Sequence, residues 1–107
     1  MRNQSDISPM MAADIPPGTC KTGRVGGKDV AVFNVDGRFY AVQANCTHAG
    51  GPLCEGSIWG DIVTCPWHAS EFNVRTGEVV SPPAETPLAT YPVTVENGMI
   101  TMGQQEP

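Results

Sequence analysis

Residues 30–42 read VAVFNVDGRFYAV, and this stretch decides the fold class. Two runs rich in β-branched and aromatic residues, 30–35 and 38–42, flank the dipeptide Asp36-Gly37. An Asp-Gly pair between such runs is typical of a two-residue type I′ hairpin, because both central residues of that turn need a positive φ. The stretch therefore predicts two antiparallel strands joined by a tight turn.

The same pattern continues on both sides of this hairpin. Asn97-Gly98 and Thr76-Gly77 are further reversals between short β-rich runs. The other predicted strands lie at 20–25, 58–64, 71–74, 78–80, 91–96 and 99–102, and the strand at 58–64 is interrupted at Gly60-Asp61. No stretch long enough for a helix has apolar residues at helical spacing. The sequence thus predicts an all-β fold, a small antiparallel β-sandwich or barrel.

Length and charge limit the classes of function. The 107 residues suffice for one domain, with 12 Gly and 10 Pro that favour many turns. The net charge is −5 and no basic stripe exists, which disfavours binding to nucleic acid or to an anionic membrane. The apolar runs are too short to span a bilayer, and no secretory signal is recognisable, so a cytoplasmic location is expected. An acidic chain suits docking onto a basic face of a partner protein.

Two segments interrupt the strand pattern. Residues 44–57 and 65–70 are rich in Cys, His, Gly and Pro, a composition typical of loops that carry ligands. They lie within one predicted domain at 13–103, between an N-terminal tail at 1–12 and a C-terminal tail at 104–107.

Each of these loops supplies one thiol and one imidazole. The first contains Cys46-Thr47-His48 and the second Cys65-Pro66-Trp67-His68, so that each loop can aim two ligands at one point. Tetrahedral zinc accepts two Cys and two His, although zinc fingers usually keep both cysteines in one half of the motif. A binuclear iron–sulfur centre explains the mixture if each loop gives its Cys to one iron and its His to the other. A Cys–His nucleophile pair is a third option, which leaves the second pair without a role.

The double motif resembles the Rieske 2Fe–2S family. The resemblance rests on Cys46-Thr47-His48 followed by GGPL at 50–53, on Cys65-Pro66-Trp67-His68, and on the later Thr76-Gly77-Glu78. It extends over roughly residues 13–102. It implies a Rieske-type domain in which a subdomain made of two loops binds one 2Fe–2S cluster.

The resemblance also implies a role for each ligand. Cys46 and Cys65 would bind one iron as thiolates. His48 and His68 would bind the other through a ring nitrogen, leaving the second nitrogen near solvent as the electron exit. Ser81-Pro82-Pro83 resembles the proline loop that covers the cluster, which extends the second cluster-binding loop to 65–83.

Several positions differ from the high-potential members of the family. Gly51 and Trp67 stand where those members have an extra disulfide, and Phe72 stands where they have a tyrosine that donates to a cysteine sulfur. Ser70 matches a serine that can donate to a cluster sulfide. Because fewer donors to sulfur disfavour the reduced state, we expect a potential near about −150 mV rather than about +300 mV. Ala69 replaces a common glycine and would be strained if its φ is positive.

These features indicate a soluble one-electron carrier and not an enzyme. The resemblance implies a ferredoxin that takes electrons from a flavin-dependent ferredoxin reductase and passes them to a terminal oxygenase, such as an aromatic-ring-hydroxylating dioxygenase. A small subunit like that of nitrite reductase, and a zinc-stabilised binding module without a redox role, are the alternatives. Cys20 and Cys54 are expected to be thiols, with a disulfide between them left open, and Trp59 is expected to pack in the core or a turn.

Overall fold

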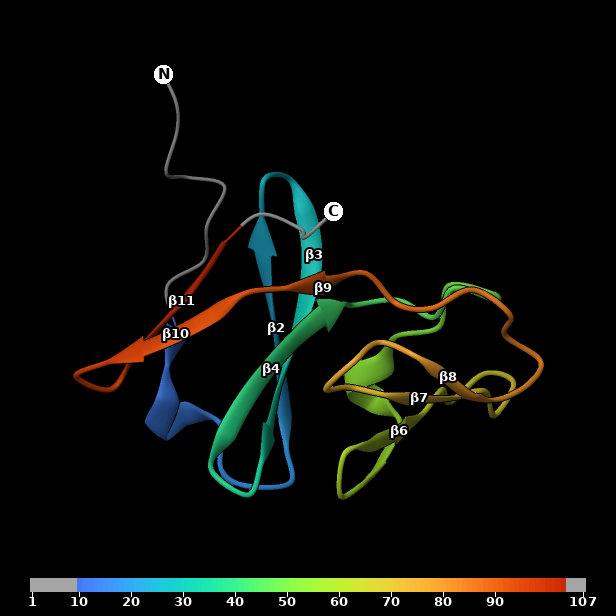
Figure 1. Cartoon of the computed structure of the whole chain (residues 1–107), viewed down its shortest axis with the longest axis horizontal. Coiled ribbons are helices and arrows are strands. Elements are labelled where there is room, and N and C mark those ends of the chain that lie inside the picture. Colours follow the sequence, from blue (N-terminus) through green and yellow to red (C-terminus); the bar gives the residue numbers. More distant parts are fainter. Residues whose placement is uncertain (1–9, 104–107) are drawn as a thin grey trace.

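The computed structural model describes residues 10–103, within which the strands form three antiparallel sheets (Figure 1). The first sheet has the order β1-β11-β10, from Met10–Met11, Met99–Met102 and Val93–Glu96. The second has the order β2-β3-β4-β9, from Cys20–Val25, Lys28–Val35, Arg38–Gln43 and Thr90–Tyr91. The third has the order β5-β6-β7-β8, from Ser57–Trp59, Ile62–Thr64, Glu71–Asn73 and Val79–Ser81. Two 3-10 helices, η2 (Ala12–Asp14) and η3 (Leu53–Glu55), complete the elements.

The first two sheets make up a basal part, and residues 44–88, which include the third sheet, make up a separate loop subdomain beside it (Figure 1). The chain enters the loop subdomain after β4 and leaves it before β9, and these two strands are paired. Gln43 and Ala89 hold the two chain ends together through a backbone bond of 2.9 Å and a second bond of 2.7 Å from the Ala89 N–H to the Gln43 side chain. Within residues 10–103, no helix is long and apolar enough to cross a membrane.

The central hairpin forms as predicted. Val35 pairs with Arg38 across the turn, and Asp36 and Gly37 have φ values of 53° and 92°. The Asn34 side chain accepts a hydrogen bond of 2.7 Å from the Gly37 N–H, which closes the turn. Both central residues therefore adopt the left-handed conformation that a type I′ turn requires.

Strand β3 is buried on both faces. Val30 and Val32 pack with the core between the two basal sheets. Ala31 and Phe33 point the other way, into the core shared with the loop subdomain. Alternate side chains of one strand thus contribute to two hydrophobic cores, because successive residues face opposite sides of a sheet.

The all-β prediction is confirmed, with local differences in the strands. The interruption predicted at Gly60-Asp61 is a full reversal, on either side of which β5 and β6 pair as two separate strands. The predicted strand at 91–96 is interrupted at Pro92, which has no N–H to donate to a ladder. Met10 and Met11, assigned to the predicted tail at 1–12, pair with β11. The predicted tail at 104–107 and residues 1–9 lie outside the described residues.

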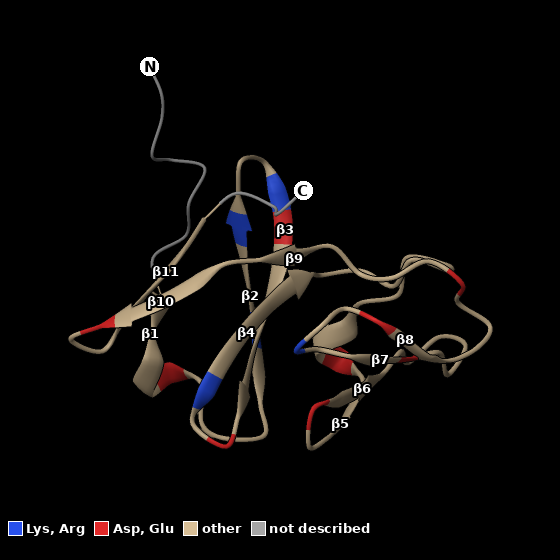
Figure 2. Ribbon diagram, viewed as in Figure 1, with Lys and Arg blue, Asp and Glu red and all other residues tan. Residues whose placement is uncertain are grey.

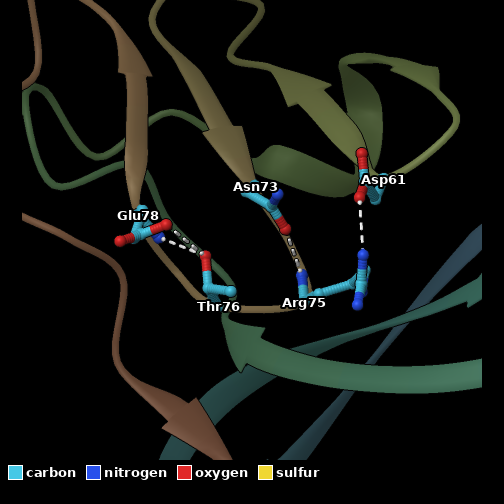
Figure 3. A network of polar contacts seen from close by, with 5 residues as sticks. All are labelled: Asp61, Asn73, Arg75, Thr76 and Glu78. Carbon is cyan, nitrogen blue, oxygen red and sulfur yellow. Dashed lines mark hydrogen bonds and ion pairs between the residues drawn. The ribbon is translucent and has the colours of Figure 1, made fainter.

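A polar network holds the end of the loop subdomain that carries the β7–β8 turn (Figure 3). The Arg75 guanidinium forms an ion pair with Asp61 at 3.4 Å, and the Arg75 backbone N–H donates to the Asn73 side chain at 2.8 Å. Thr76 and Glu78 hydrogen-bond each other twice, with both distances 3.2 Å. Polar side chains thereby brace the β7–β8 turn against the β5–β6 hairpin.

The two ligand-bearing bends, residues 46–51 and 65–70, have the same backbone design. In each, the cysteine N–H donates to the carbonyl five residues later, from Cys46 to Gly51 and from Cys65 to Ser70, both at 2.8 Å. The residue four positions after each cysteine donates back to it, Gly50 at 2.9 Å and Ala69 at 3.1 Å. That residue has a positive φ in both bends, 81° for Gly50 and 65° for Ala69. The strain expected for alanine at this position is therefore present.

A disulfide joins the basal part to the loop subdomain. Cys20, at the start of β2, is bonded to Cys54 in η3, with 5.3 Å between their Cα atoms. The expectation that both residues are thiols is wrong. Sequence could not pair them, because they lie 34 residues apart and come together only when η3 packs against β2.

We predict that removing this disulfide destabilises the protein. Cross-linking residues separated by 34 positions restricts the unfolded chain and is worth about 3–4 kcal/mol. A Cys20→Ser/Cys54→Ser double variant should therefore show a lower Tm than the parent. Thiol titration of the denatured parent, kept free of reductant and stripped of metal, should find Cys46 and Cys65 as thiols. Finding Cys20 and Cys54 reactive as well would contradict the bond.

We also predict that Ala69→Gly stabilises the protein. Glycine adopts a positive φ without the clash of a Cβ, so relief of the strain at 65° should raise the free energy of unfolding by about 1 kcal/mol. Thermal unfolding measures the change. The matched control is Ala49→Gly in the other bend, which should lower stability because Ala49 does not have a positive φ. A lower Tm for both variants would show that Ala69 is not strained.

Candidate metal centre

The two bends hold the four predicted ligands as two different pairs. The thiols of Cys46 and Cys65 are buried, with exposures of 4% and 1%. Both histidines are exposed, and the ring centroids of His48 and His68 lie 5.0 Å apart in an edge-to-face arrangement. Thus the bends place sulfur donors on the inner side and imidazoles on the solvent side.

Both thiols belong to the apolar core of the loop subdomain. Cys46 and Cys65 pack in the same cluster as Phe33 of β3 and Leu53 of η3. They are free thiols, not partners in a disulfide. A thiolate is costly in such surroundings unless a metal or hydrogen-bond donors balance its charge. The site therefore provides buried sulfur where metal coordination would compensate the charge.

The backbone of the first bend already points a donor at one sulfur. The His48 N–H lies 3.4 Å from Cys46 Sγ, within hydrogen-bonding range for sulfur. Donors of this kind stabilise negative charge on a ligand sulfur and tune a bound metal centre. The short spacing makes this contact possible, because the turn directs the backbone N–H of the second residue after Cys46 back to the sulfur.

Gly51 allows the two bends to approach each other closely. A Cβ at this position would lie 2.7 Å from Cys65 Sγ and 3.0 Å from the Trp67 ring. Any side chain would therefore displace a thiol from its place. Trp67 covers this glycine while remaining 57% exposed. Gly50, in contrast, is required for its positive φ, since no atom lies near its missing Cβ.

The second bend contributes a buried hydroxyl. Ser70 is fully buried, and its Oγ accepts a hydrogen bond of 3.0 Å from the Ala84 N–H. Its own hydroxyl proton remains available to a further acceptor. Phe72, two residues on, is also fully buried and offers no donor. The environment of the sulfurs is therefore poor in donors compared with one that contains a tyrosine at this position.

The proline segment, residues 81–86, is attached to both bends. Ala84 is bound to Ser70 of the second bend, as described above. Thr47 of the first bend donates its hydroxyl to the Thr86 carbonyl at 2.6 Å. The sequence carries no signal for this role of Thr47 beyond its position between Cys46 and His48. The segment therefore lies across both bends and links them.

The donor set fits a 2Fe–2S cluster with mixed ligands. Such a centre requires two thiolates on one iron and two imidazoles on the other. The structure supplies a buried thiol pair and an exposed imidazole pair on two adjacent bends. Within residues 10–103, no three of the His, Cys, Asp and Glu side chains are grouped around a point where one metal ion could sit. The bends instead offer one pair of thiols and one pair of imidazoles, and each iron of a binuclear cluster needs one such pair.

Trp59 does not pack in the core or in a turn, because it is 86% exposed at the end of β5. Gly56, directly after η3, packs against the backbone of Thr64, where a Cβ has no room.

Comparison with known proteins assigns the chain to a family. A family model described as the Rieske [2Fe-2S] domain matches residues 7–92. Ferredoxin CarAc of Metapseudomonas resinovorans is 39% identical over 99 residues, which cover 92% of either chain. The biphenyl dioxygenase ferredoxin subunit of Pseudomonas sp. (strain KKS102) is 45% identical over 84 residues, which cover 78% of this chain and 77% of the relative.

A solved structure shows the same fold. One chain in the complex of reduced oxygenase and oxidized ferredoxin in carbazole 1,9a-dioxygenase superposes with a TM-score of 0.84 and 38% identity, covering 91% of this chain and 92% of that chain. The family predicted from the double Cys–His motif is thereby confirmed, in preference to the alternative of a zinc-stabilised binding module. The chain belongs to the Rieske [2Fe-2S] domain family.

Proposed function

We propose that Cys46, His48, Cys65 and His68 hold one 2Fe–2S cluster, with both thiolates on one iron and both imidazoles on the other. The observation that carries this proposal is the division of the four side chains into two buried thiols and two exposed, adjacent rings. When bound, the cluster supplies reversible one-electron chemistry. The exposed rings of His48 and His68 then form the route by which electrons enter and leave.

The chain acts as an electron carrier of a dioxygenase system, and not as an enzyme. Relatives at 39% and 45% identity are named ferredoxins or ferredoxin subunits, and one name includes biphenyl dioxygenase. A structural neighbour of 38% identity occurs in a complex with its oxygenase. A terminal oxygenase is therefore the proposed acceptor. The proposed donor, a flavin-dependent ferredoxin reductase, rests on the resemblance of the sequence, and a cytoplasmic location is proposed with it.

The charge distribution supports docking through the loop subdomain. Residues 44–88 carry five carboxylates and one cation, a net charge of −4, whereas the rest of the described chain has four of each sign (Figure 2). The subdomain that holds the ligands is thus the acidic part of the described chain. It favours a basic partner face and steers the bends toward that face.

Trp67 fits the centre of such an interface. It lies between two ligands in sequence, contacts Gly51 and leaves 57% of its surface exposed. Aromatic side chains of this kind are enriched where protein interfaces exclude water. We therefore place Trp67 at the contact with the oxygenase, beside the exposed histidines.

Ligand substitutions test the cluster assignment. Cys46→Ser and Cys65→Ser should abolish or strongly weaken cluster assembly, because the hydroxyl is a poor substitute for a thiolate. Cys54→Ser, which removes a sulfur outside the bends, should retain the cluster. Iron and acid-labile sulfide content, with electron paramagnetic resonance of the reduced protein, gives the result. An unchanged spectrum in either ligand variant would disprove the assignment.

The potential should lie in the lower part of the Rieske range. Phe72 is fully buried without a donor, so the reduced, more negative cluster is poorly stabilised. Potentiometric titration should give about −150 mV, whereas a value above about 0 mV would contradict this proposal.

Electron transfer to the oxygenase should slow as salt is added. Opposite charges attract over a Debye length of about 10 Å at 0.1 M ionic strength, and the attraction weakens as salt rises. Glu85→Gln, in the proline segment, should reduce the rate at low salt by about two- to tenfold. The control Glu96→Gln lies in the basal part and should leave the rate unchanged. Stopped-flow rates that do not depend on salt would show that the acidic subdomain is not the docking part.

A further inference from the structure

Three polar side chains lie in a row across the third sheet. Thr64 of β6 pairs with Glu71 of β7, and Glu71 pairs with Ser81 of β8. The Ser81 hydroxyl donates to Glu71 Oε1 at 2.7 Å, and the Thr64 hydroxyl lies 3.5 Å from Glu71 Oε2. The strong bond is the one to Ser81, and the longer contact adds a weaker donor. One carboxylate thus bridges the two outer members of the row.

The row lies directly next to the residues that form the ligand site. Thr64 precedes Cys65, Glu71 follows Ser70, and Ser81 precedes Pro82. Register shifts between Glu71 and Phe72, so that Phe72 pairs with Val79 and Val80 has no partner in the ladder. Bulges of this kind redirect a side chain beside a functional site. Here Phe72 enters the core while Glu71 reaches the hydroxyl of Ser81.

Glu71 and Ser70 together hold the proline segment at two points. Ser81, at the start of the segment, is bound by Glu71 at 2.7 Å. Ala84, three residues later, is bound by Ser70 at 3.0 Å. Since Ser70 also closes the second bend through its carbonyl and the Cys65 N–H, any loosening of the segment is transmitted to a ligand.

The carboxylate also brings an uncompensated charge close to the site. Glu71 is half-buried, and both of its hydrogen-bond donors are neutral hydroxyls. Arg75, the one cation of the loop subdomain, is engaged with Asp61 at 3.4 Å. A fixed negative charge makes the addition of an electron to a nearby centre less favourable.

We infer that Glu71 is a positioning residue that fastens the proline segment to the second bend and, through its charge, lowers the reduction potential of the centre. This inference rests on the proposed function, because a potential is defined only when the cluster is bound. The two parts of the role can be separated, since one depends on the charge of Glu71 and the other on the hydroxyl of Ser81.

The experiment uses two variants of the cluster-loaded protein, each with a matched control. Glu71→Gln removes the charge but keeps an acceptor for Ser81. Its control is Glu78→Gln, which makes the same change at the far end of β7 and β8. Ser81→Ala keeps the charge but removes the donor. Its control is Ser57→Ala, the same change at an exposed position of the same sheet.

Glu71→Gln should raise the midpoint potential by an amount equal to about a threefold change in the oxidation equilibrium, about 28 mV for one electron. Glu78→Gln should shift it less. Ser81→Ala should leave the potential unraised while the Ala84 amide exchanges its hydrogen faster and the visible absorbance is lost faster on warming. Ser57→Ala should behave as the parent.

Equal potentials for Glu71→Gln and Glu78→Gln would overturn the charge role. Unchanged hydrogen exchange and cluster loss in Ser81→Ala would overturn the fastening role. Failure of the proposed function has a different signature, since the parent protein itself would then assemble no 2Fe–2S cluster and show no potential to compare.

Discussion

The burial of Cys46 and Cys65 in the apolar core constrains every other part of the centre. Their sulfurs pack in one cluster with Phe33 of β3, so they are anchored from the basal part as well as from the bends. Ionised sulfur in such a place requires compensation by a metal or by hydrogen-bond donors. The solvent side of the site is then left to His48 and His68, which gives the centre an insulated inner half and an accessible outer half.

The two bends share a backbone design but use the equivalent last residue differently. Position five after each cysteine is Gly51 in the first bend and Ser70 in the second. Gly51 has no side chain, and this leaves room for Cys65 Sγ to lie close to it. Ser70 uses its side chain to hold Ala84 of the proline segment. The two bends have the same backbone fold, but the site is asymmetric. The first bend leaves room for the Cys65 thiol, and the second holds the proline segment.

Sequence was sufficient for the parts of the structure that local chemistry determines. The Asp36-Gly37 turn follows from the need for two positive φ values, and the ligand spacing in each bend follows from the reach of one short turn. Contacts between distant segments could not be predicted in this way. The Cys20–Cys54 bond and the bond from Thr47 to Thr86 depend on how η3 and the proline segment pack. The prediction for Trp59 was wrong because it rested on the size of the side chain, which suggested burial. Its position at the end of β5 leaves it exposed.

An electron carrier benefits from a site that moves little when its charge changes, and the tethers of the loop subdomain serve this need. Both chain ends are clamped where Gln43 meets Ala89, and the disulfide between Cys20 and Cys54 adds a third connection on another side. The polar network around Arg75 fixes the end of the third sheet that carries the β7–β8 turn (Figure 3). Stiffness therefore comes from the periphery of the subdomain, so the first bend can keep Gly50 and Gly51 and both bends can leave their histidines exposed to a partner.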